Sequence, residues 1–242
     1  MLKTGGHIHI VGSGESRNGK TLLARLVADF VVLSGGDPAI YDADTPHGRL
    51  AEWYPERAEI VDLKTTAGQI AVFDRILDNA AIDHVVDLPA RDLLRFFAVV
   101  QQTGFVAEAM RVGLKMNLLF VLDRPDVTLA ALRTIRSSLD GLRIIAVFNE
   151  AVRVNAALEG GDNAMAALAD LAEFRLPRLD RDMLRMVEQR SFSFSRFLDQ
   201  GEPRLRALDR TVLRGFLRTV FGRFYDLGLV AGAGALKRAR LA

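Results

Sequence analysis

The chain has 242 residues, of which 50% are hydrophobic and 26% are charged, so we expect one α/β domain, residues 1–242, with a sizeable buried core. Cysteine is absent, which excludes disulfides, thiolate metal sites, iron–sulfur clusters and cysteine nucleophiles. The net charge of +2 hides an asymmetry. Residues 201–242 hold nine Lys and Arg against three Asp and Glu, a local charge of +6, which leaves −4 for the other residues.

Neither end of the chain carries a pattern typical of export or membrane insertion. The apolar run near the N-terminus is too short for a signal peptide. The stretch LGLVAGAGAL, residues 227–236, has about half the length of a membrane span. We therefore expect a soluble, cytoplasmic protein with no transmembrane segment.

Short apolar runs alternate with amphipathic patterns along most of the chain. Strands are predicted at residues 7–12, 38–44, 58–63, 83–89, 117–125 and 142–150. Helices are predicted at residues 19–33, 67–80, 91–115 (one helix or two), 126–139, 180–192 and 203–228, and residues 157–177 are expected to form a loop, a helix and a last strand. This alternation predicts a doubly wound, mostly parallel sheet flanked by helices, with residues 201–242 as a basic C-terminal helix and tail.

The segment GSGESRNGKT, residues 12–21, follows the first strand and matches G-x-x-x-x-G-K-[ST] at every fixed position. Glycines let successive backbone N–H groups face phosphate oxygens, and the next helix adds its positive N-terminal end. Lys20 is expected to reach the β and γ phosphates, and Thr21 to bind Mg²⁺. The predicted nucleotide-binding residues of the loop are Gly14, Ser16, Arg17, Asn18, Gly19, Lys20 and Thr21.

With this loop, further segments resemble the ParA/MinD-type branch of P-loop ATPases over about residues 7–190. IYDADTPHG, residues 40–48, is similar to the segment after that family's second strand, which implies that Asp44 helps to position the attacking water. HVVDLPA, residues 84–90, is similar to the family's strand ending in D-x-P, which implies that Asp87 holds Mg²⁺ through a water molecule.

Two later segments extend the resemblance. IIAVFNE implies that Asn149 recognises adenine, and FRLPRLD implies that Pro177 lies near the base. The resemblance therefore implies ATP and Mg²⁺ as cofactors, and a homodimer that depends on nucleotide. The implied activity is ATP hydrolysis, used as a switch in the partition or positioning of cargo such as plasmids or chromosomes.

The loop departs from the family pattern K-G-G-x-G-K-[ST], whose first lysine reaches the partner's phosphates. Here that lysine is Glu15, and the two glycines are Ser16 and Arg17. We expect Glu15 to face outward, where it holds Arg17 or contacts another subunit. Arginine suits phosphate well, so Arg17 would partly replace the missing lysine and hydrolysis would be slow.

The four histidines do not suggest a metal site. His7 and His9 fall on one face of the first strand, and His47 and His84 lie elsewhere in the sequence. No pair has the spacing typical of zinc ligands, so we expect core or surface positions. The metal expected is Mg²⁺ brought with the nucleotide phosphates.

Four arginines of the C-terminal helix, Arg206, Arg210, Arg214 and Arg218, recur every four residues and so share one face. The opposite face is an apolar stripe of Leu213, Phe216, Leu217, Val220, Phe221 and Phe224. DNA, an acidic lipid or an acidic protein would relieve the repulsion between the arginines. The alternative is a solvated face over a helix that packs on the core.

Three other functions remain open beside the ATPase switch. The first is a nucleotide-binding interaction protein with little or no hydrolysis, which Glu15 favours. The second is a small-molecule kinase or ligase of the same superfamily, which would need a further substrate pocket. The third is a non-enzymatic DNA- or membrane-binding module that uses the basic tail.

Overall fold

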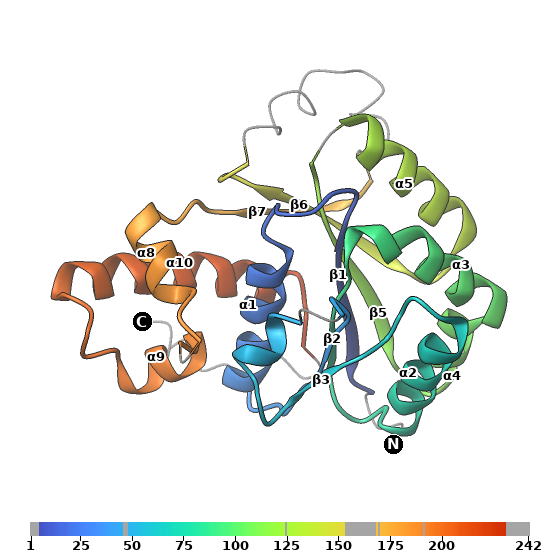
Figure 1. Cartoon of the computed structure of the whole chain (residues 1–242), viewed down its shortest axis with the longest axis horizontal. Helices are drawn as coiled ribbons and strands as arrows, with labels where there is room; N and C mark the ends of the chain where they lie inside the picture. The colour runs from blue at the N-terminus through green and yellow to red at the C-terminus, as the bar shows by residue number, and fades with distance from the viewer. Residues whose placement is uncertain are drawn as a thin grey trace.

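A seven-stranded parallel sheet forms the centre of the computed structural model, which describes residues 5–45, 48–123, 125–152, 168, 170–190 and 192–230 (Figure 1). The strands are β1 (His7–Ser13), β2 (Ala39–Asp42), β3 (Ala58–Ile60), β4 (His84–Asp87), β5 (Lys115–Val121), β6 (Arg143–Asn149) and β7 (Ala172–Leu176). Their order across the sheet is β3-β2-β4-β1-β5-β6-β7, and all six neighbouring pairs are parallel. The predicted sheet is therefore confirmed.

Strand β1 lies at the centre, between β4 and β5. Val11 pairs with Asp87 of β4, and Ser13 pairs with Val121 of β5. Because the strands are parallel, their carboxyl ends meet at one edge, directly beside the loop that follows β1. Open α/β sheets bind ligands at this edge.

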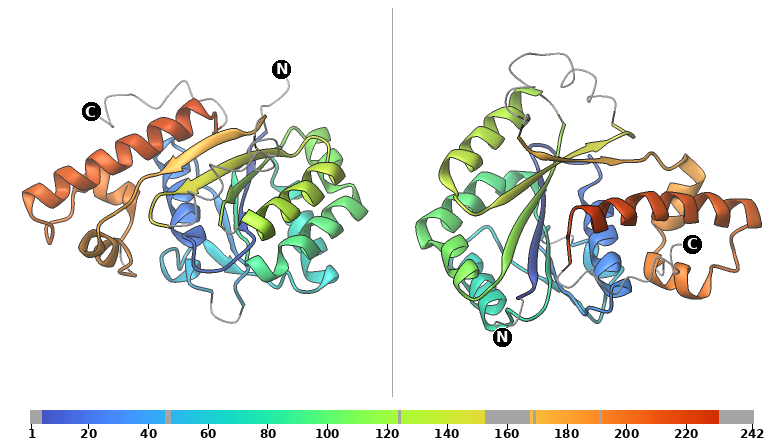
Figure 2. Two further views of the ribbon diagram at one scale, coloured as in Figure 1. Left: turned by 90° about the horizontal axis from the view of Figure 1, so that it is seen from above. Right: turned by 180° about the vertical axis from the view of Figure 1, so that it is seen from behind.

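Helices cover both faces of the sheet, and each face has its own apolar core (Figures 1 and 2). One face carries α1 (Lys20–Leu33), α8 (Arg181–Val187), α9 (Phe194–Gln200) and α10 (Ala207–Asp226). The other carries α2 (Thr66–Asp78), α3 (Leu93–Thr103), α4 (Phe105–Arg111) and α5 (Pro125–Ser138). Two short 3-10 turns, η1 (Leu50–Glu52) and η2 (Ala90–Asp92), follow β2 and β4.

The C-terminal helices lie beside α1 (Figure 2), and buried polar contacts join them to it. The carboxylate of Asp29 accepts hydrogen bonds from the backbone N–H of Phe194 at 2.7 Å and from the hydroxyl of Ser195 at 2.9 Å. The guanidinium of Arg25 donates to the carbonyl of Phe192 at 3.1 Å. The C-terminal extension is therefore fixed to the helix that begins at the predicted phosphate loop.

Residues 91–115 were predicted to form one helix or two, and one further helix was not predicted. Residues 91–115 form two helices, because Gly104 adopts the left-handed conformation (φ 65°) and ends α3. Helix α9 was not predicted, because Phe192 and Phe194 alternate with serines as in a strand. Its start is fixed by the hydroxyl of Ser193, which accepts a hydrogen bond from the N–H of Arg196 at 3.2 Å.

Helix α10 begins at Ala207, so the prediction that it starts at Pro203 is wrong. The chain forms a turn first, in which the N–H of Leu205 donates to the carbonyl of Glu202 at 3.0 Å. The side chain of Arg204 folds back to the Glu202 carboxylate at 2.9 Å. The predicted apolar stripe of α10 is confirmed, since all six of its side chains are buried in the core cluster that α10 shares with α1 and β7.

Some predictions fall outside the described residues. The helix expected within residues 157–177 lies mostly there, whereas the last strand is confirmed as β7. His47 and the basic tail from residue 231 onward are also outside. Within the described ranges, no helix combines the length and apolar character needed to cross a bilayer.

Candidate functional site

The loop between β1 and α1 has two residues in the left-handed conformation. Gly19, which directly precedes α1, has φ 95°, and a Cβ atom there would lie 2.6 Å from Nδ2 of Asn149. Arg17 has φ 61°, although a side chain disfavours this conformation. Arg17 is exposed, so the loop presents a strained arginine where the resembling family has glycine.

The ammonium of Lys20 lies inside the loop. It donates to Oγ of Ser13 at 2.8 Å, to the carbonyl of Glu15 at 2.7 Å and to Oδ1 of Asn18 at 3.3 Å. Burial lowers the pKa of Lys20, and nearby carboxylates, foremost that of Asp87, oppose this. The loop oxygens thus hold a cation at the position where the sequence motif predicts contact with phosphate.

Two side chains from neighbouring strand ends hold the loop in place. Asp123, directly beyond β5, accepts hydrogen bonds through Oδ2 from the N–H of Glu15 at 2.7 Å and from Nδ2 of Asn18 at 2.9 Å. Asn149, the last residue of β6, donates to the carbonyl of Asn18 at 2.8 Å and accepts from the N–H of Ala151 at 3.0 Å. The predicted adenine-binding residue therefore also supports the loop.

The hydroxyl of Thr21 donates to Oδ2 of Asp87 at 2.7 Å. Burial raises the pKa of Asp87 to about 7, with a further contribution from Asp42, while the Thr21 hydrogen bond and Lys20 act in the opposite direction. A hydroxyl and a carboxylate are oxygen ligands of the kind that Mg²⁺ prefers. The two predicted metal ligands are thus adjacent, in a setting where a cation would favour the charged carboxylate.

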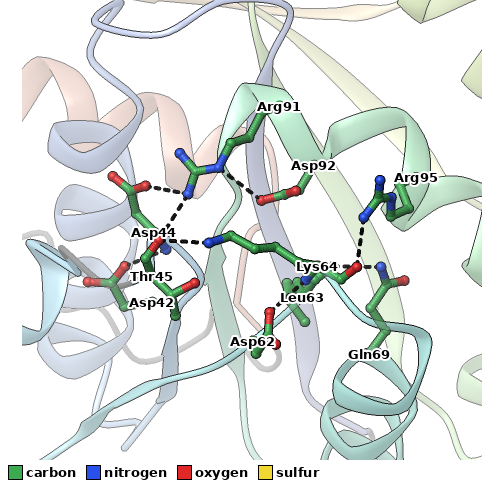
Figure 3. Close-up of polar contacts among 10 residues, drawn as sticks. All are labelled: Asp42, Asp44, Thr45, Asp62, Leu63, Lys64, Gln69, Arg91, Asp92 and Arg95. Atoms are coloured by element: carbon green, nitrogen blue, oxygen red, sulfur yellow. Dashed lines mark hydrogen bonds and ion pairs between the residues drawn. The ribbon is translucent and has the colours of Figure 1, made fainter.

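Figure 3 shows how the segment after β2 is held. The buried carboxylate of Asp42 accepts from the N–H groups of Asp44 at 3.1 Å and Ala51 at 3.0 Å. Arg91, in η2 after β4, donates to the carboxylate of Asp44 at 2.8 Å and to the carbonyl of Thr45 at 3.3 Å. The Asp44–Arg91 pair is about half exposed, at 47% and 52%. The residue predicted to position water is therefore paired with a cation.

The segment between β3 and α2 braces this arrangement (Figure 3). Nζ of Lys64 donates to the carbonyl of Thr45 at 3.0 Å. Arg95 of α3 in turn donates to the carbonyl of Lys64 at 2.8 Å, and Gln69 of α2 to the carbonyl of Leu63 at 2.7 Å. The position of Asp44 therefore depends on three elements besides β2.

The loop opens into a cavity of about 910 Å³, within the range of small-molecule and cofactor sites. The predicted site residues that line it are Gly14, Ser16, Arg17, Asn18, Gly19, Lys20, Thr21, Asp44, Asn149 and Pro177, together with Glu15. Asp87 reaches this set through Thr21. The structure thus brings together every residue predicted for the site.

Two site residues were not predicted. Asp123 lies two residues beyond β5, the strand next to β1, and an acid just after an apolar strand was the pattern that could have identified it. Arg91 follows the D-x-P segment by two residues and lines the cavity. Both assignments need the order of the strands, which places the ends of β4 and β5 on either side of β1.

The four arginines that were predicted to share one face of the C-terminal helix lie on the solvent side of α10. Arg206, Arg214 and Arg218 are exposed and Arg210 is partly buried, while the guanidinium of Arg214 lies 5.8 Å from the ring of Phe197. This placement is compatible with both a solvated face and an anion-binding face. The anionic partner stays a prediction.

No protein-family model matches the chain, and no curated protein sequence matches it significantly. Among solved structures, the chain is similar to the MinD cell division protein of Aquifex aeolicus, with a TM-score of 0.50 and 17% identity over 86% of this chain and 95% of that one. It matches the MinC:MinD complex of the same organism with a TM-score of 0.40, 15% identity, and 86% and 95% coverage. It matches the 54 kDa signal recognition particle protein of Aeropyrum pernix in complex with GDP with a TM-score of 0.47, 17% identity, and 93% and 52% coverage.

At this identity, the similarity to MinD concerns the fold. The parallel sheet and the strand–loop–helix at its centre agree with that comparison. The chain therefore has a P-loop NTPase-like α/β fold, a seven-stranded parallel sheet flanked by helices.

Proposed function

We propose that this chain binds Mg·ATP in the loop after β1, hydrolyses it slowly, and acts as a nucleotide switch that positions or partitions cargo. The observation that carries the proposal is the hydrogen bond from Thr21 to Asp87 at the first turn of α1, beside the buried ammonium of Lys20. A site for a nucleoside triphosphate needs both a cationic side chain and a metal site next to the phosphates. The 910 Å³ cavity next to them has room for the rest of the nucleotide.

The residues present fit a magnesium site. Thr21 and Asp87 would hold Mg²⁺, which when bound neutralises charge on the phosphate oxygens. Lys20 would exchange its contacts with loop oxygens for contacts with phosphate oxygens. Asn149 and Pro177 would border the base, and Asn149 would keep its support of the loop through Asn18.

For hydrolysis, we assign the orientation of water to Asp44 and the second cation to Arg17. Asp44 lies at the cavity wall, where Arg91 holds its carboxylate. Arg17 is exposed at the loop, on the same cavity. A guanidinium that is less well placed than the family's lysine would stabilise the transition state less, so turnover would be slow.

Calorimetry with Mg·ATP tests the site. We expect Lys20→Ala to weaken binding at least tenfold, about 1.4 kcal/mol, because it removes the cation held in the loop. Lys115→Ala is the control, since Lys115 is an exposed lysine at the start of β5 and does not line the cavity. Equal affinity for wild type and Lys20→Ala would refute the assignment.

Single-turnover phosphate release separates a slow ATPase from a nucleotide-binding interaction protein. Release by the wild type that Lys20→Ala abolishes supports hydrolysis, whereas tight binding without release favours the interaction protein. Light scattering with ATP, with ADP and without nucleotide tests the nucleotide-dependent homodimer. An unchanged mass in all three conditions contradicts the dimer but not the binding site.

A further inference from the structure

A second polar cluster lies at the opposite edge of the sheet from the phosphate loop. His7 and His9 project from the same face of β1, and Asp83 directly precedes β4, the neighbouring strand. One ligand atom from each of the three residues lies within 4.8 Å of the others. The phosphate loop begins at the other end of the same strand, so the two clusters do not share a residue.

The cluster is buried and incompletely hydrogen-bonded. His7 is 2% exposed and His9 is 0% exposed. Four buried nitrogen atoms here have no hydrogen-bond partner among the described residues. They are Nδ1 of His7, both ring nitrogens of His9 and Nδ2 of Asn117. Asn117 is 3% exposed and pairs with His9 across β1 and β5, so these atoms gather in one place. Buried polar atoms without partners are rare, and an ion or water is a common reason for them.

The surroundings limit what could satisfy these nitrogens. The segment after α10 covers the cluster, and the backbone of Leu229 lies near enough to both imidazoles to raise their pKa values, against the larger lowering by burial. Positive charge lies nearby as well: Arg143, whose guanidinium donates to the carbonyl of Leu227 at 2.6 Å, lowers the pKa of both histidines, and Lys115 lowers that of His7. The only carboxylate of the cluster, that of Asp83, accepts from the N–H of His7 through Oδ1 at 2.7 Å.

We propose that His7, His9 and Asp83 bind a divalent transition-metal ion of the zinc class, which joins β1 to the start of β4 beneath the end of α10. Two imidazole nitrogens and one carboxylate oxygen are a ligand set found in zinc sites, in which water or another oxygen takes the fourth position. A magnesium ion would prefer oxygen ligands alone. The hydrogen bond from the His7 N–H would orient the carboxylate, as outer-shell contacts do in metal sites.

This proposal revises the expectation that no histidine pair suits a metal. The spacing His-x-His places two imidazoles on one face of a strand, but the third ligand comes from a residue about 75 positions away, which only strand pairing brings close. The site is independent of the proposed nucleotide switch, and its role would be structural.

The test is zinc binding by the full chain. After treatment with a chelator, the protein is incubated with Zn²⁺, passed through gel filtration and analysed for metal, and Co²⁺ is added separately to record its visible absorption. We expect about one zinc per chain and a cobalt spectrum typical of four-coordinate nitrogen and oxygen ligands. We expect His9→Gln and Asp83→Asn each to weaken zinc binding by about tenfold or more, because loss of a residue that only supports a ligand already weakens metal binding by about tenfold.

Two controls keep the test specific. His84→Gln changes a histidine that is equally buried but stacks on Tyr41 at the other face of the sheet, so it should retain zinc. Asp87→Asn should also retain zinc, which excludes adventitious binding beside the phosphate loop. Asp83→Asn keeps an acceptor for the His7 N–H and is partly exposed, so it should fold even if His9→Gln does not. Less than one zinc in the wild type, or equal binding by Asp83→Asn and His84→Gln, would overturn the proposal.

Discussion

The carboxylate of Asp123 accepts a hydrogen bond from the backbone N–H of Glu15 at 2.7 Å, so the end of β5 fixes the loop that follows β1. The same oxygen accepts from Nδ2 of Asn18, and the other carboxylate oxygen accepts from the hydroxyl of Thr128. Glu15 is the residue that departs most from the family pattern, and its backbone is the part of the loop that Asp123 holds.

We therefore expect Asp123→Ala to lower the free energy of unfolding of the nucleotide-free protein by about 1–3 kcal/mol, because it removes the acceptor for the partly buried N–H of Glu15 and for the buried amide of Asn18. Chemical denaturation measures the change. Thr128→Val is the matched control, since it removes a hydrogen bond to the same carboxylate but none to the loop. A loss no larger than that of Thr128→Val would show that the contact with Glu15 contributes little.

Arg17 combines a strained backbone with an exposed guanidinium, and two substitutions separate the effects. Arg17→Gly removes the side chain and permits φ 61°, whereas Arg17→Ala removes the side chain and keeps the strain. We expect Arg17→Gly to be more stable than Arg17→Ala by about 1 kcal/mol in denaturation experiments. If the guanidinium is the second cation of hydrolysis, both variants should lose phosphate release to the same extent, and turnover equal to wild type in either one excludes that role.

Gly19→Ala should destabilise the protein by about 1–3 kcal/mol and weaken Mg·ATP binding, because φ 95° disfavours a side chain and the new Cβ would lie 2.6 Å from Nδ2 of Asn149. Thermal unfolding measures the change in stability, and calorimetry measures the change in Mg·ATP affinity. Gly215→Ala in α10 is the opposite case, since its Cβ would meet no atom within 4 Å and alanine favours a helix. The prediction fails if both variants change stability in the same direction.

Arg91→Ala should reduce Mg·ATP affinity by up to about tenfold while changing stability by less than about 1 kcal/mol, since its ion pair with Asp44 is half exposed. The expected loss arises because Asp44 then faces the cavity without its cation. Arg75→Ala is the control, because Arg75 forms a comparably half-exposed ion pair, with Glu59, but does not line the cavity. Similar affinities for the two variants would mean that Arg91 does not act on the site.

The buried carboxyl group of Asp29 should make the stability of the protein depend on pH. Burial raises the pKa of Asp29, against its hydrogen bonds from Ser195 and Phe194. The unfolded chain therefore loses this proton at lower pH than the folded protein, and the contribution of Asp29 to stability falls as pH rises above about 4. Asp29→Asn has no such proton. Urea denaturation at pH 5 and pH 8 measures the free energy of unfolding of both proteins. The stability of Asp29→Asn relative to wild type should increase as pH rises, and a constant difference would contradict the raised pKa.

Much of the fold could be predicted from local pattern. The loop from Gly14 to Thr21, the apolar runs of the strands and the D-x-P segment are all contiguous, so the sequence indicates their conformation and their place at the carboxyl edge. Residues that act through another part of the chain were missed. The roles of Asp123, Arg91 and Asp83 depend on which strands lie beside them. The order of the strands in the sheet is set by long-range pairing, which local sequence patterns do not indicate. Helix α9 was likewise missed, because serines and phenylalanines alternate at residues 191–195 as they would in a strand.

The contacts of Asp29 and Arg25 with residues 192–195 also bear on how the chain folds. Arg25 and Phe192 lie 167 positions apart, yet the guanidinium and the carbonyl meet in the interior. During synthesis, the first helix emerges long before these partners exist, with a carboxylate and a guanidinium that the finished core buries. Domains with such distant contacts fold slowly and late. The helix that begins at the phosphate loop can therefore reach its final packing only after residues 192–195 have left the ribosome.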